Sequence, residues 1–261
     1  MRVLSPKLSK DTLKDPSGLD PVVKELRRKL LKAVEATRSR SLDNLLLYMN
    51  LNAYERSVLV QNFDVLLDSL EKDLKKHQRD YFGWALLFAY LHYRQYKQIY
   101  WGVVKPEETP EGEVVYKKPD IRPEMPRIDA EAQRIYNDRV DGLMSSVRDE
   151  LSNGIKLDLD HAKLNNWDDA RLKKKLDERF RHAEHRATVI ATTELHYAYN
   201  SFIISEARKD GFNKLTWVTQ LDEFVCPICG PRHGKSFDID ALPDMPAHPS
   251  CRCVFMISIE K

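Results

Sequence analysis

The chain has 261 residues, of which 42 % are hydrophobic and 31 % are charged, so it has enough apolar material for one large domain or two small ones. The 42 Lys and Arg nearly balance the 40 Asp and Glu, so the net charge is only +2. This net charge argues against an overall electrostatic potential that would attract nucleic acid or a membrane, but it does not exclude a local basic face. The N-terminus lacks the apolar core of a signal peptide, and no run of about 20 apolar residues predicts a membrane span.

Residues 1–20 are polar and contain Pro6 and Pro16, so we expect a flexible N-terminal arm. Apolar residues at three- and four-residue spacing then predict a helical domain over residues 21–102. Its helices are expected in three segments, from Asp20, over about 59–74 and over about 81–101. The last segment is rich in aromatic residues and is expected to be a buried helix.

Residues 103–126 are expected to form a proline-rich linker or arm, because residues 105–126 hold five of the thirteen prolines. One short hairpin around Glu111-Gly112 is predicted within it. The segment is either a plain connector or a projection that touches a neighbouring subunit.

Helical spacing resumes in the second half of the chain, in a domain expected over residues 127–261. One helix is predicted from Ile128 to Leu151, with Gly154 as its stop, and another over about 168–186. The charge-dense face of the second is expected to be solvated, with a phosphate-contacting surface as the alternative. A further helix over 186–211 ends at Gly211 and carries Glu194 on a packing face, where we expect a structural hydrogen-bonding role.

After Gly211 the apolar period changes to two. Residues 214–221 and 252–259 are predicted strands, and the stretch Gly-Lys-Ser-Phe-Asp-Ile at 234–239 is a candidate third strand. The fold class is therefore α+β, with a mostly helical N-terminal region and a small antiparallel C-terminal sheet packed with helices. The cysteines are expected in the loops between the strands.

All four cysteines lie near the end of the chain. Cys226-x2-Cys229 is followed after eighteen residues by His248-x2-Cys251, a spacing that matches a two-knuckle zinc site with one Cys replaced by His. Cys253 is a fifth candidate ligand, and the spacing does not decide which four bind. Five available ligands favour a closed structural zinc over a catalytic one, since a catalytic site keeps a coordination position open.

Other interpretations of these residues stay open. Two disulfides are possible chemically but are disfavoured in a reducing compartment. His182-Ala183-Glu184 bears a faint likeness to a zinc deaminase signature, although Val225 stands where that motif has proline. A nuclease in which zinc braces a catalytic histidine would use His233 or His161.

An ordered series of motifs occupies about residues 125–261: a Thr-Glu helix followed by Tyr-Asn, a Gly-x-x-Lys-x-x-Trp strand, Asp-x-x-x-Cys-x-x-Cys, a Gly-Lys-x-Phe turn and a terminal His-Pro-x-Cys-Arg-Cys. This series resembles the Mu F-like phage head morphogenesis family, the minor head proteins of tailed bacteriophages. The resemblance is carried by Thr193, Glu194, Tyr199, Asn200, Gly211, Lys214, Trp217, Asp222, Cys226, Cys229, Gly234, Lys235, Phe237, His248, Pro249, Cys251, Arg252 and Cys253. Thr192 departs from the pattern, because family members usually carry Arg there.

The resemblance implies a structural component of the virion rather than an enzyme, located inside the head near the portal and in the host cytoplasm during assembly. Portal protein, major capsid or scaffolding protein would be its partners, and it would act in head assembly and in DNA packaging or ejection. Glu194, Asn200, Trp217 and Asp222 would be structural residues of the shared domain. The proline-rich arm and residues 81–101 are candidates for contact with the portal or shell. The alternative is a zinc-containing metal-dependent nuclease or a DNA-binding module, and the basic stretch 171–186 supports only the DNA-binding module. Neither a membrane nor a small-molecule substrate is expected.

Overall fold

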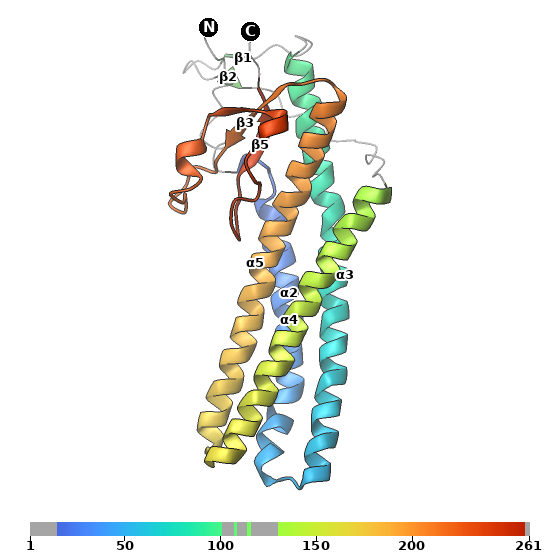
Figure 1. Ribbon diagram of the computed structural model, residues 1–261, viewed down its shortest axis with the longest axis vertical. Helices are drawn as coiled ribbons and strands as arrows, with labels where there is room; N and C mark the ends of the chain where they lie inside the picture. Colours follow the sequence, from blue (N-terminus) through green and yellow to red (C-terminus); the bar gives the residue numbers. More distant parts are fainter. Residues whose placement is uncertain (1–14, 101–106, 109–113, 116–129, 259–261) are drawn as a thin grey trace. The chain divides into compact units, whose positions relative to one another are not determined.

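The computed structural model describes residues 15–100, 107–108, 114–115 and 130–258 (Figure 1). Within these residues the chain forms four long helices, α2 (Asp20–Leu46), α3 (Ala53–Tyr100), α4 (Ala130–Asn165) and α5 (Asp169–Lys209). Three 3-10 helices, η1 (Leu47–Asn50), η2 (Gly230–Arg232) and η3 (Ile239–Ala241), connect longer elements. The strands are β1 (Glu107–Glu108), β2 (Val114–Val115), β3 (Lys214–Val218), β4 (Ser236–Asp238) and β5 (Val254–Ile257). The predicted α+β class, with a small antiparallel sheet near the C-terminus, is confirmed.

The chain divides into two compact units. Unit 1 is bounded by Met1–Val23, Tyr81–Asp129 and Thr192–Lys261, and unit 2 by Lys24–Asp80 and Ala130–Ala191. The predicted segments 1–20, 21–102, 103–126 and 127–261 stay a prediction. Residues 1–14, and 103–126 apart from β1 and β2, lie outside the described residues.

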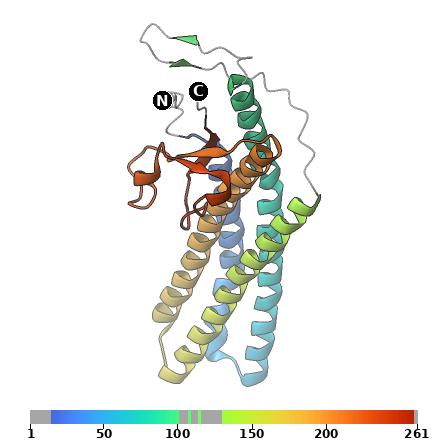
Figure 2. The ribbon, with the colours of Figure 1, turned by 45° about the horizontal axis from the view of Figure 1, so that its top comes forward.

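In unit 2, parts of all four helices lie side by side (Figures 1 and 2). Their three- and four-residue apolar spacing places one stripe of each helix inside the bundle. The stripes consist of Leu26, Leu30, Val34, Leu67, Leu70, Leu74, Met144, Val147, Leu151, Leu172, Leu176 and Phe180, all buried. Polar pairs link the same helices: Arg38 of α2 contacts Asp177 of α5 at 2.8 Å, and Gln78 of α3 donates to the hydroxyl of Tyr136 of α4 at 3.0 Å.

Several predicted helix boundaries were wrong, because neighbouring segments form longer helices. The segments 59–74 and 81–101 both belong to α3, and the segments 168–186 and 186–211 both belong to α5. No proline lies inside either helix, so nothing in the backbone chemistry interrupts the hydrogen-bond ladder.

The predicted stop at Gly154 was also wrong, since α4 continues to Asn165. The role of this glycine is to make room: a Cβ at Gly154 would lie 2.9 Å from Cδ of Arg179. Arg179 in turn binds the buried carboxylate of Asp158 at 2.7 Å. Gly154 therefore lets a cation on α5 reach a buried anion on α4.

Unit 1 contains the three-stranded sheet, with strand order β4-β3-β5 and both pairings antiparallel. Central strand β3 places Trp217 opposite Phe255 of β5, and the two rings meet edge to face at 5.5 Å. The predicted strands are thus confirmed, including the short one from the Gly-Lys-Ser-Phe stretch. The hairpin predicted around Glu111-Gly112 is confirmed too, because β1 pairs antiparallel with β2 on either side of it.

The C-terminal end of α5 follows its sequence signal closely. Gly211 has a positive φ of 76°, and the N–H groups of Phe212 and Gly211 bond the carbonyls of Ala207 and Arg208 at 3.0 and 3.2 Å. This pattern ends the helix and satisfies its last carbonyls, as glycine in the left-handed region allows. The chain then enters β3.

The aromatic segment 81–100 of α3 packs within unit 1. Phe82, Tyr93 and Tyr96 are buried, and the hydroxyl of Tyr93 donates to the carbonyl of Glu206 at 2.9 Å. Its predicted contact with a partner stays a prediction, for which Trp84, at 52 % exposure, is the large exposed side chain among the described residues of this segment. Among the described residues, none of the helices combines the length and apolarity needed to cross a membrane.

Candidate metal centre

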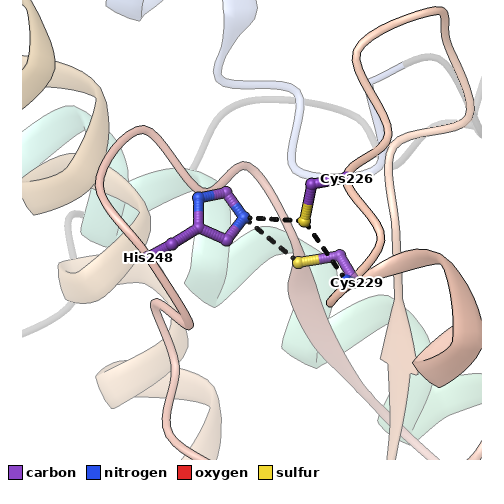
Figure 3. A group of neighbouring side chains, drawn as sticks. All are labelled: Cys226, Cys229 and His248. Carbon is purple, nitrogen blue, oxygen red and sulfur yellow. Dashed lines mark hydrogen bonds between the residues drawn. The ribbon is translucent and has the colours of Figure 1, made fainter.

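The cysteines lie in the two connections that leave and re-enter the sheet. Cys226 and Cys229 belong to the connection from β3 to β4, and His248 and Cys251 belong to the connection from β4 to β5. Cys253 directly precedes β5. Figure 3 shows the imidazole of His248 facing the sulfurs of Cys226 and Cys229 across the space between the two connections.

A tight turn forms the first half of the cluster. The N–H groups of Cys229 and Gly230 bond the carbonyl of Cys226 at 3.2 and 3.0 Å. The N–H of Cys229 also donates to Sγ of Cys226 at 3.3 Å. Backbone donors aimed at a sulfur stabilise its thiolate form, as they do at metal-binding turns.

The imidazole of His248 is held in one tautomer. Its Nδ1 lies 2.8 Å from the carbonyl oxygen of Pro249, which can only accept, so Nδ1 carries the proton. The other nitrogen, Nε2, then presents its lone pair to Sγ of Cys226 at 3.2 Å and of Cys229 at 3.3 Å. An imidazole fixed by a carbonyl in this way is the usual arrangement of a metal ligand.

Cys251 and Cys253 complete the cluster. Sγ of Cys251 lies 3.9 Å from Sγ of Cys229. The ligand atoms of Cys226, Cys229 and His248 lie within 4.8 Å of one another, and so do those of Cys229, Cys251 and Cys253. The four cysteines are free thiols, so the alternative of two disulfides has no support in the structure.

The pKa values of the cluster's side chains are shifted in different directions. A hydrogen bond from Cys253 is the largest influence that lowers the pKa of Cys251, to about 5. Burial, with Cys251 close by, raises the pKa of Cys229 to about 12. Burial also disfavours the imidazolium of His248, but the Pro249 carbonyl and the facing cysteines outweigh it and raise the pKa of His248. These shifts favour a thiolate at Cys251 and a protonated thiol at Cys229.

These distances fit a metal ion. Four ligands around a tetrahedral ion with metal–sulfur bonds of about 2.3 Å and metal–nitrogen bonds of about 2.0 Å place sulfurs about 3.8 Å apart, and sulfur and nitrogen about 3.6 Å apart. The cluster shows 3.9 Å between two sulfurs and 3.2–3.3 Å between sulfur and nitrogen. The five Cys and His side chains can therefore hold a metal ion.

Two of the predicted structural residues brace the cluster. The carboxylate of Asp222, ahead of the first cysteine pair, binds the guanidinium of Arg252 at 2.7 Å. Trp217 is fully buried in β3 and donates from Nε1 to the hydroxyl of Thr219 at 3.1 Å. The ion pair joins the two cysteine-bearing connections, and the Trp217 contact ties the first of them to the sheet.

Asn200 connects α5 to the start of β5. Its side-chain nitrogen donates to the carbonyls of His196 and Cys253 at 2.8 and 3.1 Å, and its oxygen accepts the N–H of Phe255 at 2.8 Å. Glu194, the fourth predicted structural residue, is buried at 2 % exposure. At the departure from the family pattern, Thr192 is buried, and its carbonyl accepts from Nδ1 of His196 at 2.8 Å.

The histidines considered for catalysis lie outside the cluster. Nδ1 of His233 accepts the N–H of Thr219 at 3.1 Å and so holds the end of β3. His161 and His182 are exposed. Neither they nor His233 belongs to a group that could hold a metal ion in the described part of the chain.

Thr219 is the residue of this centre that sequence reasoning missed. It is buried at 2 % exposure, and its hydroxyl contacts Trp217, the carbonyl of Cys229 and the sulfur of Cys253. The available signal was the place of Thr219 in the two-residue alternation, on the same face as Leu215 and Trp217, because a hydroxyl on a buried face needs hydrogen-bond partners.

A comparison with known protein families finds a match for part of this chain. Residues 164–256 match the family model described as Phage Mu protein F like protein. The match includes α5, β3, β4, all of β5 except its last residue, and all five Cys and His residues of the cluster. Neither the curated proteins nor the solved structures yield a match.

Proposed function

From the membership of residues 164–256 in the Phage Mu protein F like family, we propose that this chain is a minor head protein of a tailed bacteriophage. The family points to phage head morphogenesis. The finer proposal is that the chain acts at the portal during head assembly and in DNA packaging or ejection. Its partners would then be the portal protein and the major capsid or scaffolding protein, with packaged DNA as a further candidate.

The single observation that carries this proposal is the family match, which covers both cysteine-bearing connections and the sheet except the last residue of β5. The role is proposed to be structural rather than enzymatic. In support, the cluster offers five protein ligands, and the carbonyl of Pro249 orients the imidazole of His248. His233, the candidate catalytic histidine, has one ring nitrogen committed to a backbone N–H.

The metal is proposed to be zinc. Thiolates with one imidazole in tetrahedral arrangement are the donor set that zinc prefers. Bound there, zinc would supply a cross-link between the β3–β4 and β4–β5 connections, and the cysteines and His248 would hold it. Such closed sites contribute to folding free energy rather than to chemistry.

The test is incorporation into heads. The full chain is coexpressed with portal, scaffolding and capsid proteins of a tailed phage that encodes it, and the proheads are sedimented. The chain should sediment with proheads that contain portal and stay unbound when portal is omitted. A chain that remains at the top of the gradient with portal present would contradict the proposal. Metal-dependent DNA cleavage abolished by His233→Ala would instead favour the nuclease alternative.

A further inference from the structure

The first half of α3 carries an exposed stripe along one side of the helix. Tyr54, Val58 and Val65 are 78 %, 36 % and 67 % exposed, and the same side continues to Lys72 and Lys76, which are exposed too. With 3.6 residues per turn, these five side chains fall within about 40° of one another around the helix. The stripe therefore runs straight along α3 for about 33 Å, from apolar side chains at one end to cations at the other.

Charge is sparse at the apolar end of this stripe. Among the exposed residues from Ala53 to Val65, Glu55 alone is charged, in a chain of which 31 % is charged. A helix face that meets only water is usually rich in charge. At the other end, Lys72 and Lys76 form no hydrogen bond or ion pair with the residues that the structure describes. Both ends of the stripe therefore lack a partner within unit 2.

The neighbouring helix widens the apolar part of this face. Within unit 2, α4 runs antiparallel to α3 (Figure 1), and Asp64 of α3 binds Lys156 of α4 at 2.9 Å. Val65 and Leu157 each follow this pair by one position, so both turn to the same side of the two helices. Leu157 is 49 % exposed, and Leu164, two turns further along α4, is 78 % exposed. The exposed apolar face thus spans both helices.

We propose that this face binds the same face of a second copy of the chain, with the two α3 helices antiparallel about a twofold axis at Val65. In an interface of this kind, the same patch serves on both copies. Positions that are equally far from Val65 on opposite sides then face each other. Tyr54 of one copy faces Lys76 of the other, and Val58 faces Lys72.

The two ends of the stripe complement each other in charge and shape. A lysine ammonium near the ring of Tyr54 gains a cation–π contact, and the lysine stems cover apolar surface while their charged ends stay in water. Glu55 accepts the N–H of Asn52 with one carboxylate oxygen, at 2.8 Å, and its other oxygen can bind Lys76 of the second copy. A parallel pair would instead set lysine against lysine. The charges of this chain therefore favour an antiparallel second copy as the occupant.

The centre of the proposed interface is apolar. Val65 meets its own copy at the axis, and Leu157 of the two copies lies beside that contact, because α4 flanks α3 on the same side in both copies. Two pairs of helices packed in this way remove from water the apolar surface that one copy leaves exposed. Since only short lengths of two helices take part, we expect a dimer that dissociates on dilution.

Analytical ultracentrifugation of the purified full chain, over a range of concentrations, tests the pairing. The parent should form dimers that dissociate on dilution. Val65→Glu sets two carboxylates against each other at the axis and should raise the dimer Kd at least about tenfold. Leu31→Glu makes the same change at an exposed residue of α2 and should leave the Kd within about twofold of the parent. Glutamate is a good helix former, so circular dichroism should show both variants folded.

An exchange of charge tests the orientation. Tyr54→Lys places a cation opposite Lys76, and Lys76→Glu places a carboxylate beside Glu55, so each change alone should weaken the dimer. In the double variant the new cation of one copy faces the new carboxylate of the other, and the dimer should be restored. In a parallel pair positions 54 and 76 would lie about 33 Å apart, and no restoration would follow.

Three results would each overturn the proposal: a parent that stays monomeric, equal weakening by Val65→Glu and Leu31→Glu, or no restoration in the double variant. A monomeric parent whose entry into proheads is blocked by Val65→Glu alone would assign the face to another head protein, and the pairing would again be overturned. The pairing is measured on the purified chain without proheads. Its failure and the failure of the proposed function are therefore distinguishable.

Discussion

Arg252 and Asp222, thirty positions apart, form an ion pair of 2.7 Å that joins the two connections carrying the cysteines. The side chains are 25 % and 19 % exposed, so solvent screens the pair only in part. The guanidinium also lies 5.7 Å from the ring centroid of Phe224, and the carboxylate accepts the N–H of Phe224 at 3.0 Å. This pair brings the two halves of the cluster together through protein contacts alone.

Breaking the Arg252–Asp222 pair should loosen the cluster. Arg252→Gln is expected to lower the free energy of unfolding by about 1–2 kcal/mol, because a partly buried charged hydrogen bond is lost. A double-mutant cycle with Asp222→Asn, followed by denaturant unfolding, measures the coupling. Arg28→Gln, which breaks an exposed pair with Glu25, is the control and should leave the stability nearly unchanged. A coupling near zero would mean that the pair does not hold the connections.

Removing a ligand should affect the two units differently. Cys226→Ser, or a chelator added to the parent, is expected to unfold the sheet and its connections while the helices of unit 2 stay folded, because their core contains no residue of the cluster. Near-ultraviolet circular dichroism follows Trp217, and far-ultraviolet dichroism follows the helices. A variant that melts like the parent, together with a chelator that has no effect, would exclude a structural metal.

Asn200→Asp should be strongly destabilising. The substitution replaces a nitrogen that donates to two carbonyls with an oxygen that can only accept, in a side chain that is 1 % exposed. We expect a cost of about 2–4 kcal/mol in thermal or denaturant unfolding. Asn165→Asp makes the same chemical change at an exposed residue that bonds the carbonyl of His161, and it should cost less than about 1 kcal/mol. Equal costs would contradict the clamp role of Asn200.

Two glycines of α4 should respond oppositely to alanine. Gly142→Ala meets no atom within 4 Å and should stabilise the helix by about 0.5–1 kcal/mol. Gly154→Ala should destabilise by about 1–2 kcal/mol, since its Cβ would displace Arg179 from the buried carboxylate of Asp158. Chemical denaturation of both variants decides this; stabilisation by Gly154→Ala would show that Arg179 moves without cost.

Stability should fall in mild acid because of His92. Burial lowers the pKa of His92 from 6.5 to about 4, and its Nδ1 lies 2.8 Å from the hydroxyl of Tyr199. Below pH 6.5 the unfolded chain takes up a proton that the folded chain refuses until about pH 4, so the free energy of unfolding falls across this window, by about 2–3 kcal/mol in total. Denaturant unfolding of the parent and of His92→Gln between pH 7 and pH 4 measures the difference. Parallel curves would mean that His92 does not contribute.

The periodicity and spacing of residues predicted which helices and strands form better than they predicted where the helices end. The strands, the hairpin and the end of α5 at Gly211 follow from local chemistry that acts within a few residues. The continuity of α4 through Gly154 could not be predicted, because the reason lies in Arg179 on another helix. Sequence signals for helix ends predict that a helix stops at such a glycine, because they take no account of contacts with other helices.

The cluster was likewise predictable in membership but not in roles. The spacing of the cysteines and His248 named five candidates. The spacing did not predict that the buried hydroxyl of Thr219, one residue beyond β3, contacts both the carbonyl of Cys229 and the sulfur of Cys253. Relations of this kind arise only when segments distant along the chain meet, so a single sequence does not contain them.

Cys229 and Cys251 stand 22 positions apart, yet their sulfurs meet at 3.9 Å. An ion shared by them would act on the denatured ensemble as a disulfide does, by closing a long loop and removing conformational freedom. Unlike a disulfide, such a tether needs no oxidant and can be undone by a competing chelator. Where thiols are kept reduced, this part of the chain could therefore still be cross-linked, and the supply of metal rather than the redox state would set how often the cross-link forms.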